Sequence, residues 1–473
     1  MSEDLRRSSA INHANGSEQR MRGGCSVEQQ EPKVIIRNEA LDENLMERIC
    51  TRENLNRAYK RVLKNKGAEG VDGKTVSELG PWLKERKDEI IERLLTGKYK
   101  PQKVRGVEIP KPNGGKRQLG IPTVIDRFVQ QSIVQILEPI LDPTFSESSY
   151  GFRPNRNAHQ ALKKAQEYVR EGRAVVVDID LEKFFDKVNH DVLMSRLEKR
   201  IKDKRLLKIV RRFLEAGIMK NGVVSERKEG MPQGGNLSPL LSNLLLDELD
   251  KELEKRGHKF CRYADDCNVY VRSRKAGERV MSSLKLFLGK KLRLKVNENK
   301  SKVAPPMECK FLGYTITNEG KLIIAKESVN RLKDKIRQLT RRNLSKSLEE
   351  VVCKLNEKLR GWIGYFKLTD YLSQLRALDG WIRRKLRCYK LKQKKRNFTI
   401  AKYLITLGVK AHSAWNTAKS SKGWWRLSKS PALHQALNNG GFEQLGLINL
   451  QNQSIRLKSL TKTAVCDNAR TVV

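Results

Sequence analysis

Four aspartates are the side chains whose types and spacing could do chemistry together. Asp178 and Asp180 end the apolar run AVVVDID, and Asp265 and Asp266 are adjacent in KFCRYADDCNVYVRS. Adjacent aspartates also occur in β-turns for purely structural reasons, so the second pair alone is ambiguous. If both segments are neighbours in one sheet, three or four carboxylates converge. Like charges about 4 Å apart repel by about 4 kcal/mol at an effective dielectric of about 20, so such a cluster favours bound cations.

The ligand atoms indicate which cation would bind. Carboxylate oxygens without a nearby His or Cys favour Mg²⁺ over Zn²⁺. Two such ions, about 3.5–4 Å apart, can activate a 3′-hydroxyl and stabilise a departing pyrophosphate. The predicted chemistry is therefore nucleotidyl transfer with two Mg²⁺ ions.

Strands and hairpins must position these aspartates. Residues 174–180 are apolar and mostly β-branched before the carboxylates, which predicts a buried strand whose end meets solvent or a metal. Residues 259–273 alternate on both sides of the acidic turn, which predicts a β-hairpin. A second hairpin, with a basic tip, is expected over residues 104–122. Helical spacing predicts helices over residues 51–67, 79–95, 126–137, 158–171, 191–215 and 240–256.

The charge balance limits the class of partner. The chain has 473 residues, with 96 Lys and Arg against 54 Asp and Glu, for a formal net charge of +42. Residues 326–473 hold 32 of the basic residues and 9 of the acidic ones, and residues 383–396 include nine basic residues in fourteen. This predicts a polyanionic partner, most simply nucleic acid. A generally basic protein without such a partner is the alternative, whereas one amphipathic helix on an anionic membrane would not account for so wide a spread.

Length and cysteine usage set further limits. The length predicts about three domains. No run approaches the ~20 apolar residues that cross a bilayer, and the N-terminus lacks the apolar core of a signal peptide. The eight cysteines are scattered without a CxxC, which argues against a disulfide framework or a structural zinc site. We therefore expect an intracellular, cytoplasmic protein with reduced thiols and no membrane contact.

The pattern becomes helical after FLGYTI. Apolar residues recur at helical spacing, and one helical stretch, 347–366, begins with the capping box Ser347-x-x-Glu350. Gly361 and Gly364 weaken this helix and predict the close approach of a neighbour or of RNA.

At the acidic turn the sequence resembles a known family. Tyr263-Ala264-Asp265-Asp266 resembles the YADD box of reverse transcriptases, and further blocks occur in the order that this family uses. More narrowly, residues 45–450 resemble a bacterial group II intron-encoded reverse transcriptase/maturase. The other blocks are IPKPNGGKRQLGIPTVIDR, SYGFRPNRNAHQAL, VVVDIDLEKFFDKVNHDVL, GMPQGGNLSPLLSNLLLDELD, LRLKVNENKSKV and KFLGYTI.

The resemblance implies an α+β fold of the right-hand polymerase type. Fingers and palm, with an antiparallel sheet carrying YADD, would be followed by an α-helical thumb/maturase domain and a basic C-terminal region. The expected parts are a flexible leader at 1–40, an N-terminal extension that clamps template RNA at 41–97, fingers and palm at 98–325, the thumb/maturase domain at 326–395, and a DNA- and RNA-binding region at 396–473.

The resemblance also implies roles for the aspartates. In this family the metal-binding aspartate of the first palm motif precedes an aromatic residue by five positions, which selects Asp180, five before Phe185, rather than Asp178. Asp265 and Asp266 would complete the catalytic metal site, with Asp265 the firmer ligand. Asp178 would then be a supporting or a surface residue.

Basic and aromatic residues receive roles in binding nucleotides and nucleic acid. Phe185 would exclude a 2′-hydroxyl by its bulk, unless it only packs in the core beside Phe184. Surface roles are the alternative for the lysines and arginines. The implied nucleotide contacts are Lys111, Arg117, Phe185, Gln233 and Lys300. The implied template or RNA contacts are Arg105, Arg383, Arg384, Lys385 and Arg387.

These features predict an RNA-directed DNA polymerase that extends a DNA primer on template RNA with dNTPs. The resemblance implies that the protein also binds its group II intron RNA to promote splicing and copies it at a DNA target during retrohoming. A splicing-only maturase with a vestigial polymerase site, and a domesticated reverse transcriptase in phage defence or a CRISPR locus, are the alternatives. Because only His412, His434 and Cys466 follow residue 400 as possible nuclease ligands, we expect the form without an HNH endonuclease domain.

Overall fold

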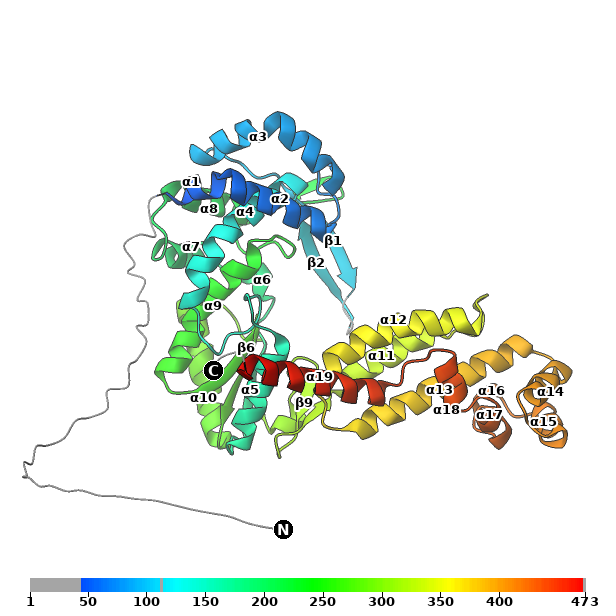
Figure 1. The fold of residues 1–473 in the computed structure, drawn as a ribbon. Coiled ribbons are helices and arrows are strands. Elements are labelled where there is room, and N and C mark those ends of the chain that lie inside the picture. The colour runs from blue at the N-terminus through cyan, green and yellow to red at the C-terminus, as the bar shows by residue number, and fades with distance from the viewer. Residues whose placement is uncertain (1–43, 111–113, 471–473) are drawn as a thin grey trace, which may run out of the picture. The chain divides into compact units, whose positions relative to one another are not determined.

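The computed structural model describes residues 44–110 and 114–470 and, for residues 461–470, the backbone alone (Figure 1). The leader expected at 1–40 and Lys111 lie outside these ranges.

The N-terminal part consists of helices that pack against one another. They are α1 (Leu45–Cys50), α2 (Arg52–Asn65), the 3₁₀ turn Val76–Glu78, α3 (Leu79–Leu95) and α4 (Val124–Leu141). The N–H of Asn54 donates to the Thr51 hydroxyl at 3.4 Å and caps α2, and the Asn54 side chain donates to the Ser132 carbonyl of α4 at 3.0 Å. The helices predicted at α2 and α3 are confirmed. α4 begins earlier than predicted because Thr123 caps it, accepting from the Asp126 N–H at 3.1 Å.

The first sheet joins the basic hairpin to a second, shorter hairpin. Its strands are β1 (Val104–Pro110), β2 (Lys116–Ile121), β4 (Ile218–Lys220) and β5 (Val223–Ser225), in the order β2-β1-β4-β5. β1 and β2 pair antiparallel, as predicted, with Arg117 opposite Ile109. β1 and β4 pair parallel, with Val104 opposite Ile218, so a segment distant in sequence anchors the basic hairpin.

The second sheet carries the aspartates. Its strands are β3 (Val175–Ile179), β6 (Lys259–Tyr263), β7 (Asp266–Val271) and β8 (Lys302–Ala304), in the order β6-β7-β3-β8. All three pairings are antiparallel, and Asp178 lies opposite Asn268 of β7. The prediction that the two acidic segments are neighbours in one sheet is confirmed.

Helices bury both faces of this second sheet. They are α5 (Ala158–Arg170), α9 (Ser238–Lys255) and α10 (Arg274–Phe287), which continues into a π-helical turn, Leu288–Leu292. The helices that follow β3 in the chain are α6 (Phe184–Lys187), α7 (His190–Glu198) and α8 (Lys204–Glu215), and α7 packs against α8 and α9. Val177 and Ile179 pack into the core formed with α4, α9 and α10, whereas Val176 and Tyr270 pack on the side of α5. Because side chains alternate along a strand, Asp178 and Asp180 share the face of Val176.

The remaining part of the described chain is mostly helical. A hairpin of β9 (Tyr314–Ile316) and β10 (Leu322–Ile324) leads into α11 (Lys326–Leu339), α12 (Leu348–Phe366) and α13 (Leu372–Lys394). The capping box at the start of α12 is confirmed, because Ser347 and Glu350 exchange hydrogen bonds of 3.0 and 3.1 Å. The helices that follow are α14 (Asn397–Thr406), α15 (Ala411–Ala418), α16 (Trp424–Leu427), α17 (Pro431–Ala436), α18 (Asn439–Gln444) and α19 (Leu450–Arg470), the last of which lies beside α12 and α13 (Figure 1).

The described part of the chain does not itself supply the close neighbour expected at Gly361 and Gly364, and the alternative, close approach of RNA, stays a prediction. A Cβ added at Gly361 or Gly364 would meet no atom of the described chain within 4 Å, so no protein neighbour approaches these glycines closely. Among the described residues, no helix is both long enough and apolar enough to span a membrane.

Candidate functional site

The acidic turn is the tight connection between β6 and β7. Tyr263 and Asp266 pair across it, so that Ala264 and Asp265 form the loop. Ala264 has φ +58°, a left-handed conformation that residues other than glycine, asparagine and aspartate rarely adopt. A strained backbone conformation persists only where neighbouring groups hold it. At Ala264 these neighbouring groups are buried polar side chains.

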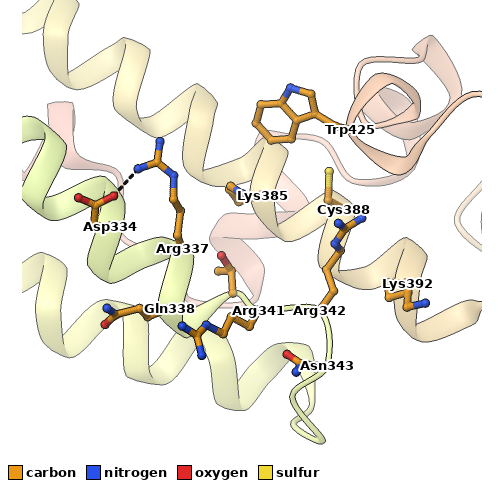
Figure 2. Close-up of a pocket in the computed structure, with 11 residues that line it drawn as sticks. Asp334, Arg337, Gln338, Arg341, Arg342, Asn343, Lys385, Cys388, Lys392 and Trp425 are labelled. Carbon is orange, nitrogen blue, oxygen red and sulfur yellow. Dashed lines mark hydrogen bonds and ion pairs between the residues drawn. The ribbon is translucent and has the colours of Figure 1, made fainter.

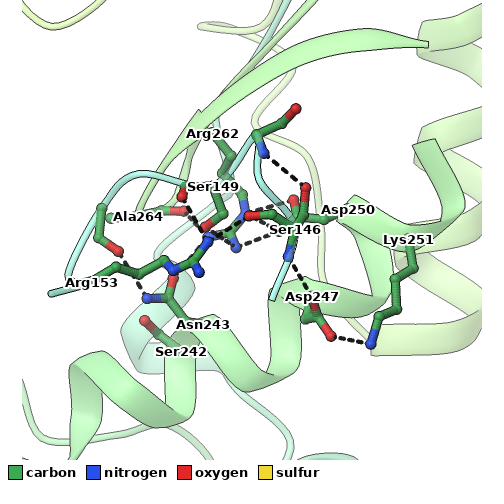
Figure 3. A network of polar contacts seen from close by, with 12 residues as sticks. Ser146, Ser149, Arg153, Ser242, Asn243, Asp247, Asp250, Lys251, Arg262 and Ala264 are labelled. Carbon is green, nitrogen blue, oxygen red and sulfur yellow. Dashed lines mark hydrogen bonds and ion pairs between the residues drawn. The ribbon is translucent and has the colours of Figure 1, made fainter. Parts of the chain in front are cut away.

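Arg262, the residue before the YADD box, links this turn to α9 through its side chain (Figure 3). The guanidinium is fully buried and donates to both carboxylate oxygens of Asp250 on α9, at 2.7 and 2.5 Å. It also donates to the Ala264 carbonyl at 2.9 Å and to the Asn243 side-chain oxygen at 3.0 Å. Because a guanidinium is planar and rigid, these contacts tie the turn to α9.

Gly151 touches the same turn from the other side. Asn243 donates to the Gly151 carbonyl at 2.8 Å. A Cβ at this position would lie 2.2 Å from the backbone nitrogen of Ala264, far inside van der Waals contact. The glycine of SYGFRP is therefore required by the close approach of two backbones.

We expect Arg262→Met to lower the free energy of unfolding by about 3–5 kcal/mol, because Asp250 would stay buried without its partner. Urea denaturation measures this change. Arg274→Met is a suitable control, since Arg274 forms only a surface ion pair with Glu278. If the two variants unfolded at the same urea concentration, the Arg262–Asp250 network would not stabilise the fold as predicted.

The carboxylates of the two acidic segments act on one another electrostatically. Burial raises the pKa of Asp266 to about 6, and the charges of Asp265 and Asp180 add to this effect. Burial also raises the pKa of Asp265, as does the charge of Asp180, whereas Arg117 and Lys300 lower it. The pKa of Asp178 is raised to about 6, first by burial and then by the charge of Asp266. Asp180, Asp265 and Asp266 therefore lie within electrostatic reach of one another, and Asp178 lies within reach of Asp180 and Asp266.

The loop that leads into β8 fixes Asp180. The Asp180 N–H donates to the Ser301 hydroxyl at 2.9 Å, and the Asn297 N–H donates to the Asp180 carbonyl at 2.8 Å. The Lys300 ammonium lies 3.2 Å from the Asp180 carboxylate, which keeps 29% of its side chain exposed. Lys300 therefore neutralises this carboxylate, and its predicted contact to the nucleotide stays a prediction.

The donor set suits a hard divalent cation, since it consists of carboxylate oxygens that repel one another. Among the residues that the structure describes, no group of three or more His, Cys, Asp or Glu side chains is arranged so that it could hold a metal ion. Asn268, with its amide turned so that the nitrogen faces Asp178, donates to that carboxylate at 2.9 Å. Asp178 is thus held in the sheet by its partner on β7.

A cavity of about 420 Å³ next to this site includes Phe185 and Gln233 in its lining. Phe184 is buried in the core, and its ring meets the half-buried Phe185 edge-on at 5.2 Å. Arg117 donates from Nε to the Gln233 side-chain oxygen at 2.5 Å. The structure therefore brings together three residues, Arg117, Phe185 and Gln233, that the sequence assigned to one nucleotide.

Sequence reasoning missed Arg227 in the same cavity. Its Nη1 is buried without a hydrogen-bond partner, and burial lowers its pKa to about 10. The only available signal was its position shortly before GMPQGG, which is weak because Arg227 stands in a run of charged residues, Glu226–Glu229, that is typical of a surface turn.

The basic residues expected to contact RNA divide into different groups. Arg105 is exposed on β1. Arg387 is buried and donates to the Leu437 carbonyl at 3.0 and 2.7 Å, so its role as an RNA contact is corrected to a structural one. Arg384 stacks on Trp425, whereas Arg383 and Lys385 stay half-exposed.

The chain matches two family models and is similar to several known proteins. Residues 109–316 match the family model of reverse transcriptase (RNA-dependent DNA polymerase), and residues 329–404 match the group II intron, maturase-specific domain. Protein YkfC of Escherichia coli (strain K12) is 33% identical over 55% of this chain and 79% of its own length. Group II intron-encoded protein LtrA of Lactococcus lactis subsp. cremoris is 29% identical over 67% of this chain and 69% of its own. A solved partial Cas6-RT-Cas1–Cas2 complex overlaps 52% of this chain and 42% of that one at 27% identity, with a TM-score of 0.35.

A YADD turn beside a second acidic strand end, within a matching polymerase region, defines a reverse transcriptase. The maturase-specific match narrows the class further. The chain belongs to the family of group II intron-encoded reverse transcriptases with a maturase domain. It is an RNA-directed DNA polymerase with a splicing maturase function.

Proposed function

We propose that Asp180, Asp265 and Asp266 are the catalytic residues and that they bind two Mg²⁺ ions. The observation that carries this proposal is the turn with Asp265 and Asp266, supported by the buried Arg262, beside the strand end at Asp180. Bound ions would activate the primer 3′-hydroxyl and stabilise the departing pyrophosphate. The protein holds the carboxylates in place through the Arg262 network and the loop that binds Asp180.

Removal of the metal tests this proposal. Primer extension is expected to require Mg²⁺ and to stop in EDTA, because the carboxylates alone cannot lower the pKa of the 3′-hydroxyl. Asp180→Asn should need a higher Mg²⁺ concentration for half-maximal activity, since one charged ligand is lost. Extension that continues in excess EDTA would contradict the metal assignment.

The nucleotide site is proposed to lie in the cavity that includes Phe185 and Gln233. Gln233 would contact the incoming dNTP, with Arg117 orienting its amide and contributing positive charge toward the phosphates. Lys300 would neutralise charge at the same site, released from Asp180 when cations bind. The predicted contact at Lys111 lies outside the described residues and stays a prediction.

Phe185→Ala is expected to admit ribonucleotides, because the side chain that would meet a 2′-hydroxyl is removed. We expect the preference for dNTP over NTP to fall by about 10–100-fold, the scale of a steric pocket change. Single-nucleotide extension with dTTP and UTP on poly(rA) measures the ratio. An unchanged ratio in an active variant would assign Phe185 to core packing beside Phe184.

The proposed nucleic-acid partners are the group II intron RNA, a template RNA with a DNA primer, and a DNA target at which the intron is copied. The concentration of basic residues after residue 326 supports this, because phosphate backbones neutralise such charge. The name of LtrA links that protein to a group II intron. We place this chain in the cytoplasm, at the nucleoid when it is bound to target DNA; the free thiols of the described cysteines are consistent with a reducing compartment.

A group II intron ribozyme encoded next to the gene would show that the protein serves an intron and is not a domesticated reverse transcriptase. An intron precursor that splices at low Mg²⁺ only when the protein is present would support the maturase function. A splicing-only protein is disfavoured because the carboxylates and their buried support are all present.

A further inference from the structure

A groove of about 900 Å³ lies between α11, the turn after it, α13 and α16 (Figure 2). It is separate from the acidic sheet, and none of its lining residues comes from the palm. Five basic side chains and one aromatic side chain dominate the lining, namely Arg337, Arg341, Arg342, Lys385, Lys392 and Trp425.

The groove has an excess of positive charge. Its one carboxylate, Asp334, forms an ion pair with Arg337. Within the part of the chain that the structure describes, Arg341, Arg342 and Lys385 form no ion pair with an acidic side chain. The cations therefore repel one another without compensation, and binding of an anion would relieve this repulsion.

Trp425 presents an aromatic surface beside these cations. The side chain keeps 39% of its surface exposed. The Arg384 guanidinium lies 3.6 Å from the ring centroid and donates to the Trp425 carbonyl at 2.7 Å, which holds the indole in place. The Lys385 ammonium is 5.3 Å from the same ring. A fixed, exposed indole next to phosphate-binding cations is the combination that binds single-stranded nucleic acid.

We propose that this groove binds an unpaired stretch of RNA, with one base stacked on Trp425 and the neighbouring phosphates on Arg341, Arg342 and Lys385. An unpaired strand is required because the faces of bases in a duplex are covered by their neighbours. RNA is favoured because most of α11 and all of α13 lie within the maturase-specific match. The inference deepens the proposed function by assigning a site to RNA binding outside the polymerase site.

Photo-crosslinking of the full chain to a 12-nucleotide oligouridine containing 4-thiouridine tests the site directly. The expected result is a cross-linked peptide that contains Trp425 or Arg341 and Arg342. Cross-links confined to the palm and to β1 and β2 would overturn the proposal.

Variants measured by fluorescence anisotropy with the same oligouridine test the roles of the base and the phosphates. Trp425→Ala should weaken binding about fivefold or more, whereas Trp425→Phe should retain most of the affinity because it keeps a stacking surface. Arg341→Ala with Arg342→Ala should weaken binding by a similar factor. The matched control is Lys275→Ala with Arg279→Ala, which removes two exposed charges from α10 and should have little effect.

A blunt RNA duplex separates base stacking from charge. Trp425→Ala should leave duplex binding nearly unchanged, and equal losses for duplex and oligouridine would contradict stacking on Trp425. Primer extension by the wild-type preparation keeps this test independent of the polymerase proposal. If the protein extends primers but cross-links only through its palm, the proposal that the groove binds RNA is wrong and the polymerase proposal stands. If it cross-links through Trp425 but never extends a primer, the polymerase proposal is wrong and the groove proposal stands.

Discussion

Asp265→Ala is expected to reduce primer extension by about a thousandfold or more while RNA binding and splicing stay largely intact. The carboxylate lies in the YADD turn, within electrostatic reach of Asp180 and Asp266, and its loss would remove a ligand from the proposed metal site. Losses of this size are usual when a catalytic group is removed. Extension on a primed RNA template and splicing of an intron precursor, both with one preparation, measure the separation.

Asp191→Ala provides the matched control for this prediction. Asp191 is exposed and pairs with Arg211 at 2.7 Å on the surface, so the same chemical change should affect neither activity strongly. If Asp265→Ala lost splicing and extension to the same extent while its thermal transition was unchanged, the two activities would share one site. That result would contradict the separation of polymerase and maturase functions.

Gly151→Ala is expected to lower kcat/KM for extension by about a hundredfold without touching a proposed metal ligand. The added Cβ would meet the Ala264 backbone nitrogen at 2.2 Å, so the turn that carries Asp265 must move. Displacement of a catalytic group by about 1 Å commonly costs this much in rate. Steady-state extension kinetics measure the loss, and circular dichroism checks that the fold is kept.

Gly289→Ala is the control glycine, because a Cβ there would meet nothing within 4 Å. It should extend primers at nearly the wild-type rate. An active Gly151→Ala protein would mean that the backbone approach at Ala264 is not needed to position the acidic turn.

The sequence predicts the strands that carry the aspartates, but it does not predict the buried side chains that hold the acidic turn in place. A continuous apolar run predicts the strand before Asp178, which is buried on both faces, and an alternating pattern predicts the hairpin around the YADD turn. The pairing of β3 with β7 was conditional on the two segments meeting, and the structure confirms it. Arg262 was missed because its partner Asp250 lies on another element, and local patterns do not encode long-range pairing.

The basic segment after residue 383 illustrates the same limit. Composition groups its arginines and lysines together, but a helix turns each side chain to a different environment. Arg387 faces the core and binds the Leu437 carbonyl, whereas Lys385 faces the groove. Arg341 and Arg342 join this groove from another segment, so only the tertiary structure identifies the cations that lie together.

Extension of oligo(dT) on poly(rA) with dTTP and Mg²⁺ is the most direct test of the central claim that this chain polymerises DNA on RNA. The purified protein is expected to add deoxythymidines to the primer, and the Asp265→Ala protein, prepared in parallel, is expected to add almost none. A wild-type protein that binds the primed template but never lengthens the primer would contradict the claim.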